Sequence, residues 1–187
     1  MVEPLVPPGQ TAVSRLRRLD LGVVPRVPRE KWDLRVTGSV EAPVRWTWAE
    51  FTALPQVSIT ADFHCVTGWS RLGNGWEGVS FRELAARVRP RASAVSAMLY
   101  SGEGYTTSLP LEVLMDDDVL LAHSLDGKPL PEDHGGPLRL IVPKRYAWKS
   151  AKWLRQVDIL DKHELGYWEV RGYSDTADPW TQDRYSL

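Results

Sequence analysis

Residues 57–70, which read VSITADFHCVTGWS, constrain the fold of this chain more than any other stretch of it. Apolar and polar side chains alternate up to Asp62, which is the pattern of a β-strand with one buried face. The strand carries His64 and Cys65 to its end, and Gly68 lets the chain bend immediately afterwards. Cys65 is the one cysteine among the 187 residues. The stretch therefore predicts a strand that presents a lone thiol at a turn.

A lone cysteine in such a position has three chemical roles open to it. It can be a buried small hydrophobe, which is the usual fate of an unpaired cysteine. It can be a nucleophile that an adjacent base such as His64 activates. It can also be a soft ligand that holds a metal cofactor. Adjacent residues on a strand point to opposite faces, which argues against a working pair of His64 and Cys65.

The overall composition excludes several classes of protein. A chain of 187 residues is long enough for one domain with a sizeable core. A formal net charge of −1 argues against a protein that coats nucleic acid or an anionic membrane. No apolar run approaches the roughly 20 residues needed to cross a bilayer, and the basic residues near the N-terminus lack the apolar segment of an export signal. We therefore expect a cytoplasmic protein without membrane insertion.

Both ends of the chain are expected to be irregular. Prolines and a glycine predict an extended arm over residues 1–18, followed by one domain over residues 19–187. Within that domain, residues 161–187 are polar and aromatic without a helical or strand period, which predicts a segment that wraps the surface.

Local signals predict that the domain is mostly sheet. Thr47 with Glu50, and Ser80 with Glu83, form capping patterns that start two short helices. The pair Asp126-Gly127 predicts a tight turn. Five or six strands are expected, at residues 32–38, 57–65, 94–100, 119–125 and 138–142 and in the run that ends at 160. Because no βαβ regularity connects them, the expected fold class is α+β and mostly β.

Two apparent motifs do not support a function. Residues 73–78 fit the pattern G-x-G-x-x-G, but no strand leads directly into them as a dinucleotide site requires. We therefore predict that the stretch up to Gly78 is a loop. The four histidines show no spacing typical of a zinc hydrolase, which argues against a metal site built from histidine.

A second informative stretch is basic. From Arg139 to Arg155 the chain has six basic residues and no acidic one, which predicts a local electropositive surface. A solvated basic face is the ordinary interpretation. The alternative is a phosphate site, in which Gly135 and Gly136 bring backbone N–H groups close to an anion beside His134. Arginine and lysine are the usual side-chain partners of phosphate.

Three separated motifs together resemble a known family. They are the strand and turn with His64-Cys65, the run DHGGPLR at 133–139 and the run KSAKW at 149–153. In this order they resemble the molybdopterin-binding domain of the sulfite oxidase family, and most of all its short, single-domain bacterial oxidoreductases. The resemblance covers residues 19–185 and implies the sulfite oxidase-type molybdopterin-binding fold in a single domain. It also implies Mo-molybdopterin as the cofactor, with one molybdenum and one pterin.

The resemblance implies a role for seven residues. Cys65 falls where the family's cysteine thiolate ligates molybdenum, and Tyr173 where a tyrosine lies near the oxo group of the metal. Five more residues fall where the family holds the pterin and its phosphate: His134, Arg139, Ser150, Ala151 and Lys152.

The implied function is two-electron oxygen-atom transfer at a cysteine-ligated molybdenum, on a small-molecule substrate and with a separate electron-transfer partner. Two functions of other classes remain as alternatives. One is a thiol-dependent enzyme that uses Cys65. The other is a non-catalytic module that uses residues 139–155 to bind nucleic acid in a salt-sensitive way. The molybdenum enzyme is the preferred interpretation, because it gives a role both to the stretch with Cys65 and to the basic stretch. In this interpretation the protein has no nucleic-acid partner.

Overall fold

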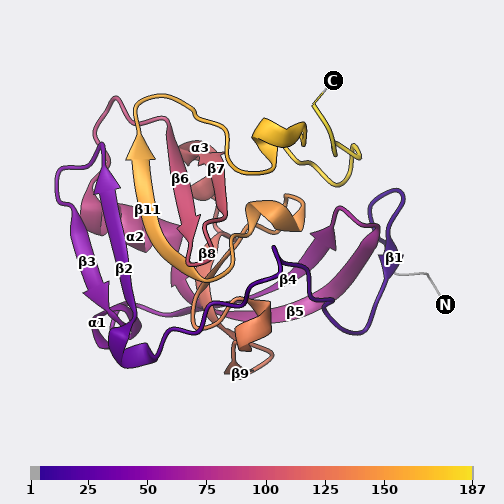
Figure 1. The fold of residues 1–187 in the computed structure, drawn as a ribbon, viewed down its shortest axis with the longest axis horizontal. Helices are drawn as coiled ribbons and strands as arrows, with labels where there is room; N and C mark the ends of the chain where they lie inside the picture. The colour runs from indigo at the N-terminus through magenta and orange to yellow at the C-terminus, as the bar shows by residue number, and fades with distance from the viewer. Residues whose placement is uncertain (1–4, 187) are drawn as a thin grey trace.

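The computed structural model describes residues 5–186, which form two β-sheets (Figure 1). The larger sheet contains the strand that ends at Cys65. Its order is β1 (Thr11–Ala12), β5 (Trp69–Ser80), β8 (Leu120–Leu125) and β10 (Arg139–Ile141). β4 (Val57–Cys65) also pairs with β5, and β9 (Lys128–Pro129) pairs with β8. The predicted cysteine strand is therefore confirmed, and it lies in the sheet that also contains Arg139.

The second sheet has five strands. Their order is β3 (Val44–Thr47), β2 (Asp33–Gly38), β11 (Leu154–Leu160), β6 (Ser96–Ser101) and β7 (Thr106–Pro110). β2 and β11 are parallel, with Val36 opposite Val157, and the other pairs are antiparallel. The long connection from β2 to β11 brings the early and late parts of the chain into one sheet.

Short helices connect the strands. The α-helices are α1 (Trp48–Thr52), α2 (Phe81–Val88) and α3 (Leu111–Leu114). The 3-10 helices are η1 (Arg29–Lys31), η2 (Glu132–His134), η3 (Ala147–Lys149) and η4 (Glu169–Arg171). The α+β, mostly β class predicted from the sequence is confirmed.

The main core lies between the two sheets. In β8, Leu121 belongs to the cluster that includes Leu34 and Leu99 of the second sheet. Its neighbours Leu120 and Ala122 belong to a second cluster on the opposite face, together with Cys65. Because successive side chains of a strand alternate between faces, the larger sheet is buried on both sides. Cys65 thus lies in a packed environment rather than on an open sheet face.

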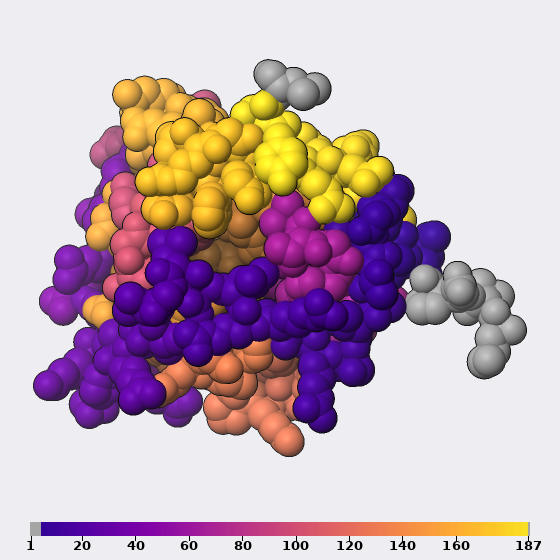
Figure 2. All heavy atoms as spheres, turned by 45° about the vertical axis from the view of Figure 1, so that its right-hand side comes forward, coloured from indigo at the N-terminus to yellow at the C-terminus, as the bar shows by residue number. Residues whose placement is uncertain are grey.

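Both ends of the described chain run along one side of the molecule. Figure 2 shows the N-terminal segment (residues 5–28) crossing the surface below the C-terminal segment (residues 161–186), with a hollow between them. Residues 1–4 of the predicted arm lie outside the described residues, and the predicted boundary between residues 18 and 19 stays a prediction. Among the described residues, no helix is long and apolar enough to cross a membrane.

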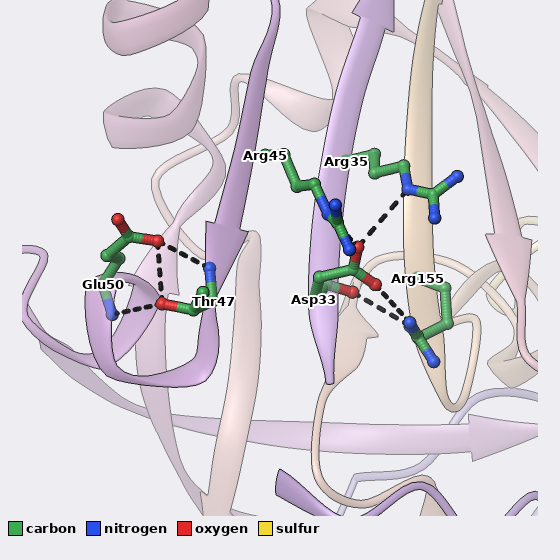
Figure 3. A network of polar contacts seen from close by, with 6 residues as sticks. All are labelled: Asp33, Arg35, Arg45, Thr47, Glu50 and Arg155. Atoms are coloured by element: carbon green, nitrogen blue, oxygen red, sulfur yellow. Dashed lines mark hydrogen bonds and ion pairs between the residues drawn. The ribbon is translucent and has the colours of Figure 1, made fainter. Parts of the chain in front are cut away.

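One buried carboxylate fastens the edge of the second sheet (Figure 3). Asp33 is 4% exposed and pairs with Arg35, Arg45 and Arg155 of strands β2, β3 and β11. Burial raises the pKa of Asp33, but the hydrogen bonds from Arg155 and Arg45 outweigh it and lower the pKa to about 2. The ion pairs hold the start of β11, which begins two residues after Lys152 in the chain. Figure 3 also shows the capping box of α1, in which Glu50 accepts from the Thr47 backbone N–H at 2.8 Å, as the sequence predicted.

The predicted loop up to Gly78 is wrong, because these residues form the twelve-residue strand β5. A Cβ atom on Gly78 would lie 2.0 Å from the carbonyl oxygen of Leu121, and one on Gly75 would lie 3.7 Å from the Cα atom of Asp126. A glycine inside a strand often marks a close approach of another backbone. Gly78 therefore lets the neighbouring strand pack against β5 and does not mark a loop, whereas the distance at Gly75 is an ordinary contact.

The predicted number of strands was too low. The described residues contain eleven strands, and those missed include short strands of two to five residues such as β1, β3, β7 and β9. Strands this short carry too few side chains for a clear period of two. The predicted turn at Asp126-Gly127 is confirmed, with φ values of 52° and 73° between the paired residues Leu125 and Lys128.

Candidate active site

A cavity of about 250 Å³ opens between the N-terminal segment, the end of β4 and the C-terminal segment. Its floor is visible in the hollow of Figure 2. The structure brings all seven residues singled out in the sequence to the wall of this cavity: Cys65, His134, Arg139, Ser150, Ala151, Lys152 and Tyr173.

Cys65 lies at the tip of the β4–β5 hairpin. It pairs with Trp69, which leaves three residues in the turn, and Gly68 takes a φ of 91°. The Cys65 side chain is buried, and its Sγ lies 3.2 Å from Oγ1 of Thr67. Burial raises the pKa of the Cys65 thiol, whereas the hydrogen bond from Thr67 and the charges of Arg17 and Arg184 lower it. The thiol is thus protonated at neutral pH unless a cation binds it.

His64 does not serve Cys65. Its Nδ1 lies 2.8 Å from Oγ of Ser70, and its ring packs edge-on against Trp180 with the centroids 6.3 Å apart. Cys65 lines the cavity, and His64 does not. The neighbours therefore point to opposite faces of the strand, as expected from the alternation.

Arg139 is a buried cation. It is 3% exposed, and its guanidinium donates to the carbonyl oxygens of His134 at 2.8 Å and Ser150 at 2.9 Å. It also lies over the ring of Phe63, 4.9 Å from the centroid. Burial lowers the pKa of Arg139 to about 9, and no carboxylate of the described residues pairs with it. Its charge is therefore uncompensated inside the protein, at the wall of the cavity.

The predicted backbone nest at Gly135 and Gly136 is wrong. The N–H of Gly135 donates to Glu132 at 3.1 Å, and that of Gly136 donates to Pro131 at 3.0 Å. The two glycines serve close packing, because a Cβ on Gly135 would lie 2.9 Å from Cβ of Lys152. The contribution of this loop to the cavity is instead the side chain of His134, whose pKa is lowered by burial.

Ser150 and Ala151 brace the same wall through local hydrogen bonds. The Ser150 hydroxyl accepts from the backbone N–H of Val142 at 3.0 Å. The carbonyl oxygen of Ala151 accepts from the N–H of Leu140 at 2.8 Å. These bonds tie the segment before Lys152 to β10, so that both sides of the Arg139 guanidinium are fixed.

Lys152 connects this wall to the N-terminal segment. Its Nζ donates to the carbonyl oxygen of Leu19 at 2.6 Å and lies 4.1 Å from the centroid of the Trp153 ring. Burial and the charge of Arg139 lower the pKa of Lys152 to about 8, against the opposing effect of Asp20 and Glu103. A bound dianion would favour the charged form of Lys152 and so oppose the effects of burial and of Arg139 on its pKa. Lys152 is therefore suited to bind a phosphate.

We expect the half-buried Lys152 to make the stability of the cofactor-free protein depend on pH. Between pH 8 and the ordinary lysine pKa of about 10.4, the unfolded chain binds a proton that the folded chain has lost. The free energy of unfolding therefore rises with pH in this window. Urea unfolding at pH 7 and 9.5 should show the wild type gaining roughly 2 kcal/mol relative to Lys152→Met. A difference between the two proteins that does not change with pH would contradict the lowered pKa.

Tyr173 comes from the C-terminal segment and meets an aromatic wall. Its ring packs edge-on against Trp148, with the centroids 5.3 Å apart, and lies tilted against Trp168, with the centroids 5.0 Å apart. The segment is anchored by Lys149, a fully buried side chain whose Nζ lies 2.6 Å from Oε1 of Glu169 and 3.1 Å from Oδ1 of Asp175. Tyr173 is thus held over the cavity, although the sequence places it in an irregular tail.

The basic stretch 139–155 does not form the predicted electropositive surface. Arg139 and Lys149 are buried, and Lys152 lines the cavity. Lys144 pairs with Asp116 at 2.9 Å, and Arg155 pairs with Asp33. The acidic partners come from distant parts of the chain, which a count along the sequence could not include.

Sequence reasoning missed much of the wall. The N-terminal segment contributes Arg17 and Asp20, the turn after β6 contributes Glu103, and Trp69, Trp148 and Trp168 add aromatic surface. Nε1 of Trp148 and Oε2 of Glu103 are buried without a hydrogen-bond partner among residues 5–186. The only signal in the sequence was the richness in tryptophan, and tryptophan is more often a core residue.

The fold and this cavity together define a molybdopterin-binding oxidoreductase. The family described as "Oxidoreductase molybdopterin binding domain" matches residues 21–168. The chain therefore belongs to this family, a branch of the sulfite oxidase family, and its cofactor is Mo-molybdopterin. The structure is similar to the sulfane dehydrogenase SoxCD from Paracoccus pantotrophus, with a TM-score of 0.70 and 23% identity over 84% of this chain and 46% of the other.

Several known sequences are also similar to the chain. The "uncharacterized oxidoreductase YuiH" of Bacillus subtilis is 39% identical and covers 97% of this chain and 92% of its own length. The "putative protein-methionine-sulfoxide reductase subunit YedZ1" of Azospira oryzae is 31% identical over 81% of this chain and 57% of its own length. A nitrate reductase of Hordeum vulgare is 29% identical, and the match spans 80% of this chain and 20% of the enzyme.

The residues present fit such a cofactor. Among residues 5–186, no group of three His, Cys, Asp or Glu side chains gathers to hold a metal ion by itself. The cavity offers one soft sulfur ligand instead, as a metal already held by a dithiolene requires. The buried, unpaired charge of Arg139 and the lysine at 152 offer a place for an anionic phosphate. The unpartnered polar atoms of Trp148 and Glu103 are further possible contacts with a polar ligand.

Proposed function

We propose that the protein is a molybdenum enzyme that catalyses two-electron oxygen-atom transfer on a small substrate, with Cys65 as the protein ligand of the metal. The observation that carries the proposal is that Cys65, Arg139 and Lys152 line one cavity although they lie far apart in the sequence. When bound, the cofactor supplies the oxygen transfer and the change of redox state. The residues of this chain bind and orient it and shape the space in which the substrate meets it.

Two sets of charged groups act on residues that line the cavity. Arg17 and Arg184 act on the thiol of Cys65, whereas Arg139 acts on His134 and Lys152. We assign the second set to the pterin phosphate, and Ser150 and Ala151 to the backbone that holds it. Binding of the metal would deprotonate the Cys65 thiol, because a coordinating thiol loses its proton outright. The raised pKa of the free thiol is compatible with that role.

The structure disfavours both alternative functions. A thiol-dependent enzyme needs a base within reach of Cys65, but His64 faces away and its Nδ1 is bound to Ser70. A nucleic-acid module needs exposed cations, but Arg139 and Lys149 are buried. We therefore retain a small-molecule substrate and no nucleic-acid partner. A separate electron-transfer partner and a cytoplasmic location remain parts of this proposal, which co-purification and cell fractionation can test.

Quantification of molybdenum and pterin in the purified protein tests the proposed function. Amounts close to one molybdenum and one pterin per chain would support it. Activity that survives complete removal of molybdenum and is blocked by iodoacetamide would show a thiol enzyme instead.

Tyr173 is the second residue that we propose to take part in the reaction. Tyr173 lines the cavity, where its phenol would donate a hydrogen bond to the substrate. Loss of one donor from a preorganised site costs about 10²–10³ in rate. We expect Tyr173→Phe to fold and to bind molybdenum fully, but to turn over at least roughly tenfold more slowly per molybdenum, a floor below that range. The measurement is the steady-state rate divided by the molybdenum content.

Tyr185→Phe is the matched control for Tyr173→Phe. The two tyrosines form a β-bridge with ring centroids 5.2 Å apart, but Tyr185 does not line the cavity. Its variant should turn over at the wild-type rate. Equal rates per molybdenum for wild type and Tyr173→Phe would make Tyr173 a structural residue.

A further inference from the structure

The turn at the tip of the β4–β5 hairpin directly follows the buried Cys65. Between Cys65 and Trp69 the chain makes a three-residue turn, closed by one hydrogen bond from Gly68 N–H to the Cys65 carbonyl oxygen at 3.1 Å. Hairpin tips are usually among the least rigid parts of a fold. A metal ligand, in contrast, has to be held within about 0.5 Å of its working position. The turn at residues 65–68, here called the cysteine turn, therefore needs support from elsewhere.

The N-terminal segment supplies the first support. The side-chain amide of Gln10 donates to the Cys65 carbonyl oxygen at 3.1 Å. The backbone N–H groups of Thr11 and Val13 donate to Gly68 at 2.9 Å and to Ser70 at 2.8 Å. These bonds place an extended strand directly beside the cysteine turn.

Gln10 is itself held in place by a buried relay. The Ser70 hydroxyl donates to Oε1 of Gln10 at 3.2 Å. Because that hydroxyl has a single proton, it accepts from Nδ1–H of His64, 2.8 Å away. The buried histidine next to Cys65 thus orients the amide that binds the Cys65 carbonyl, which gives His64 a structural purpose on the face opposite the cavity.

The C-terminal segment supplies the second support. The Arg184 guanidinium donates to the carbonyl oxygen of Val66, the residue after Cys65, and lies 5.4 Å from the centroid of the Tyr146 ring. The backbone of Arg184 is held in turn, because its carbonyl oxygen accepts from the N–H of Ser174 at 3.0 Å. Ser174 directly follows Tyr173, so the same segment positions both Tyr173 and Arg184.

The two terminal segments also touch each other. Gly9 has a φ of 69°, and a Cβ on it would lie 2.9 Å from Oε1 of Gln182 and 3.3 Å from Nη2 of Arg184. A Cβ on Gly68 would lie 3.3 Å from the carbonyl oxygen of Gly9. The cysteine turn therefore lies under a contact between both ends of the described chain.

We propose that Gln10 and Arg184 are positioning residues that hold the cysteine turn in the geometry needed for metal ligation. They bind the consecutive carbonyl oxygens of Cys65 and Val66, one from each end of the chain. This inference rests on the proposed role of Cys65 as a ligand. It assigns a purpose in the active site to two segments that the sequence would class as peripheral.

The experiment compares Arg184→Gln and Gln10→Met with the wild type, first without cofactor. Hydrogen exchange of the amides of residues 66–70 should become at least tenfold faster in both variants, while exchange in β6 and β11 stays unchanged. In the molybdenum-loaded proteins, the visible absorption from thiolate-to-metal charge transfer, normalised to molybdenum, should shift or weaken. Arg184→Lys keeps a donor and a charge and should restore much of both signals.

Arg171→Gln is the matched control for Arg184. Arg171 also belongs to the C-terminal segment, donates to a carbonyl oxygen (that of Tyr167, at 2.7 Å) and stacks on an aromatic ring, but it does not touch the cysteine turn. It should leave exchange at residues 66–70 and the absorption band unchanged. The proposal would be overturned if hydrogen exchange at residues 66–70 stayed unchanged in Gln10→Met and in Arg184→Gln. It would also be overturned if Arg171→Gln accelerated that exchange as much as Arg184→Gln does. The exchange measurement needs no metal, so its outcome is separate from whether Cys65 is a ligand.

Discussion

A Cys65→Ser variant is expected to fold normally and to lose turnover by more than about 100-fold. Loss of an outer-shell partner alone typically costs 10–100-fold in metal affinity or activity, and the ligand itself should matter more. A serine hydroxyl is a hard and weakly acidic ligand, which does not replace a thiolate on a metal that prefers soft donors. The folded state should change little, because serine has nearly the size of cysteine and keeps the contact with Thr67.

The measurements for this variant are the turnover, the molybdenum content and the visible absorption of the purified protein. The charge-transfer absorption should disappear even where some molybdenum remains. Cys65→Ala serves as the control, because alanine offers the metal no ligand atom. Its turnover and absorption should match those of Cys65→Ser. A Cys65→Ser protein with the spectrum and rate of the wild type would contradict ligation by Cys65.

An Arg139→Met variant is expected to lose most of its cofactor. A hydrogen bond to a charged group contributes about 1.5–3 kcal/mol, which corresponds to roughly 10–150-fold weaker binding when it is removed. A ligand that binds only the folded state also stabilises it, so the midpoint of thermal unfolding should fall together with the cofactor content. In the cofactor-free variant, two changes have opposite effects on the stability of the folded state. Removal of the buried charge stabilises it, whereas the loss of the donor to the carbonyl oxygens of His134 and Ser150 destabilises it.

Occupancy and thermal unfolding of Arg139→Met are to be compared with Arg145→Met. Arg145 belongs to the same basic stretch, but within residues 5–186 it donates only to the carbonyl oxygen of Lys144, and it does not line the cavity. Its variant should keep full cofactor content. Full occupancy in Arg139→Met with only a raised KM would mean that Arg139 faces the substrate and not the pterin phosphate.

Local signals in the sequence were reliable where one residue type decides a local geometry. Glu50 completes the capping box with Thr47, and Asp126-Gly127 makes the predicted turn, because each depends only on residues a few positions apart. The alternation before Cys65 likewise predicted its strand, because one buried face imposes a period of two.

The errors occurred where the meaning of a residue depends on a distant partner. Gly78 was interpreted as part of a loop, but it makes room for Leu121 of another strand. Gly135 was expected to offer its N–H to an anion, but that group is used within the turn and the missing side chain makes room for Lys152. Glycine permits both uses, and only the neighbouring chain selects between them.

The residue types of the site and their order follow from the sequence alone, including one thiol at the end of a strand and a basic stretch with a lysine at 152. Which of these residues meet depends on the packing of the two sheets. It turned Arg139 inward onto two carbonyl oxygens, used Lys149 as a buried anchor for the segment that bears Tyr173, and placed both ends of the described chain over the cysteine turn. The physical reason is that a buried polar group has to find its partners within the protein, and those partners come from whichever segments the packing of the two sheets brings near.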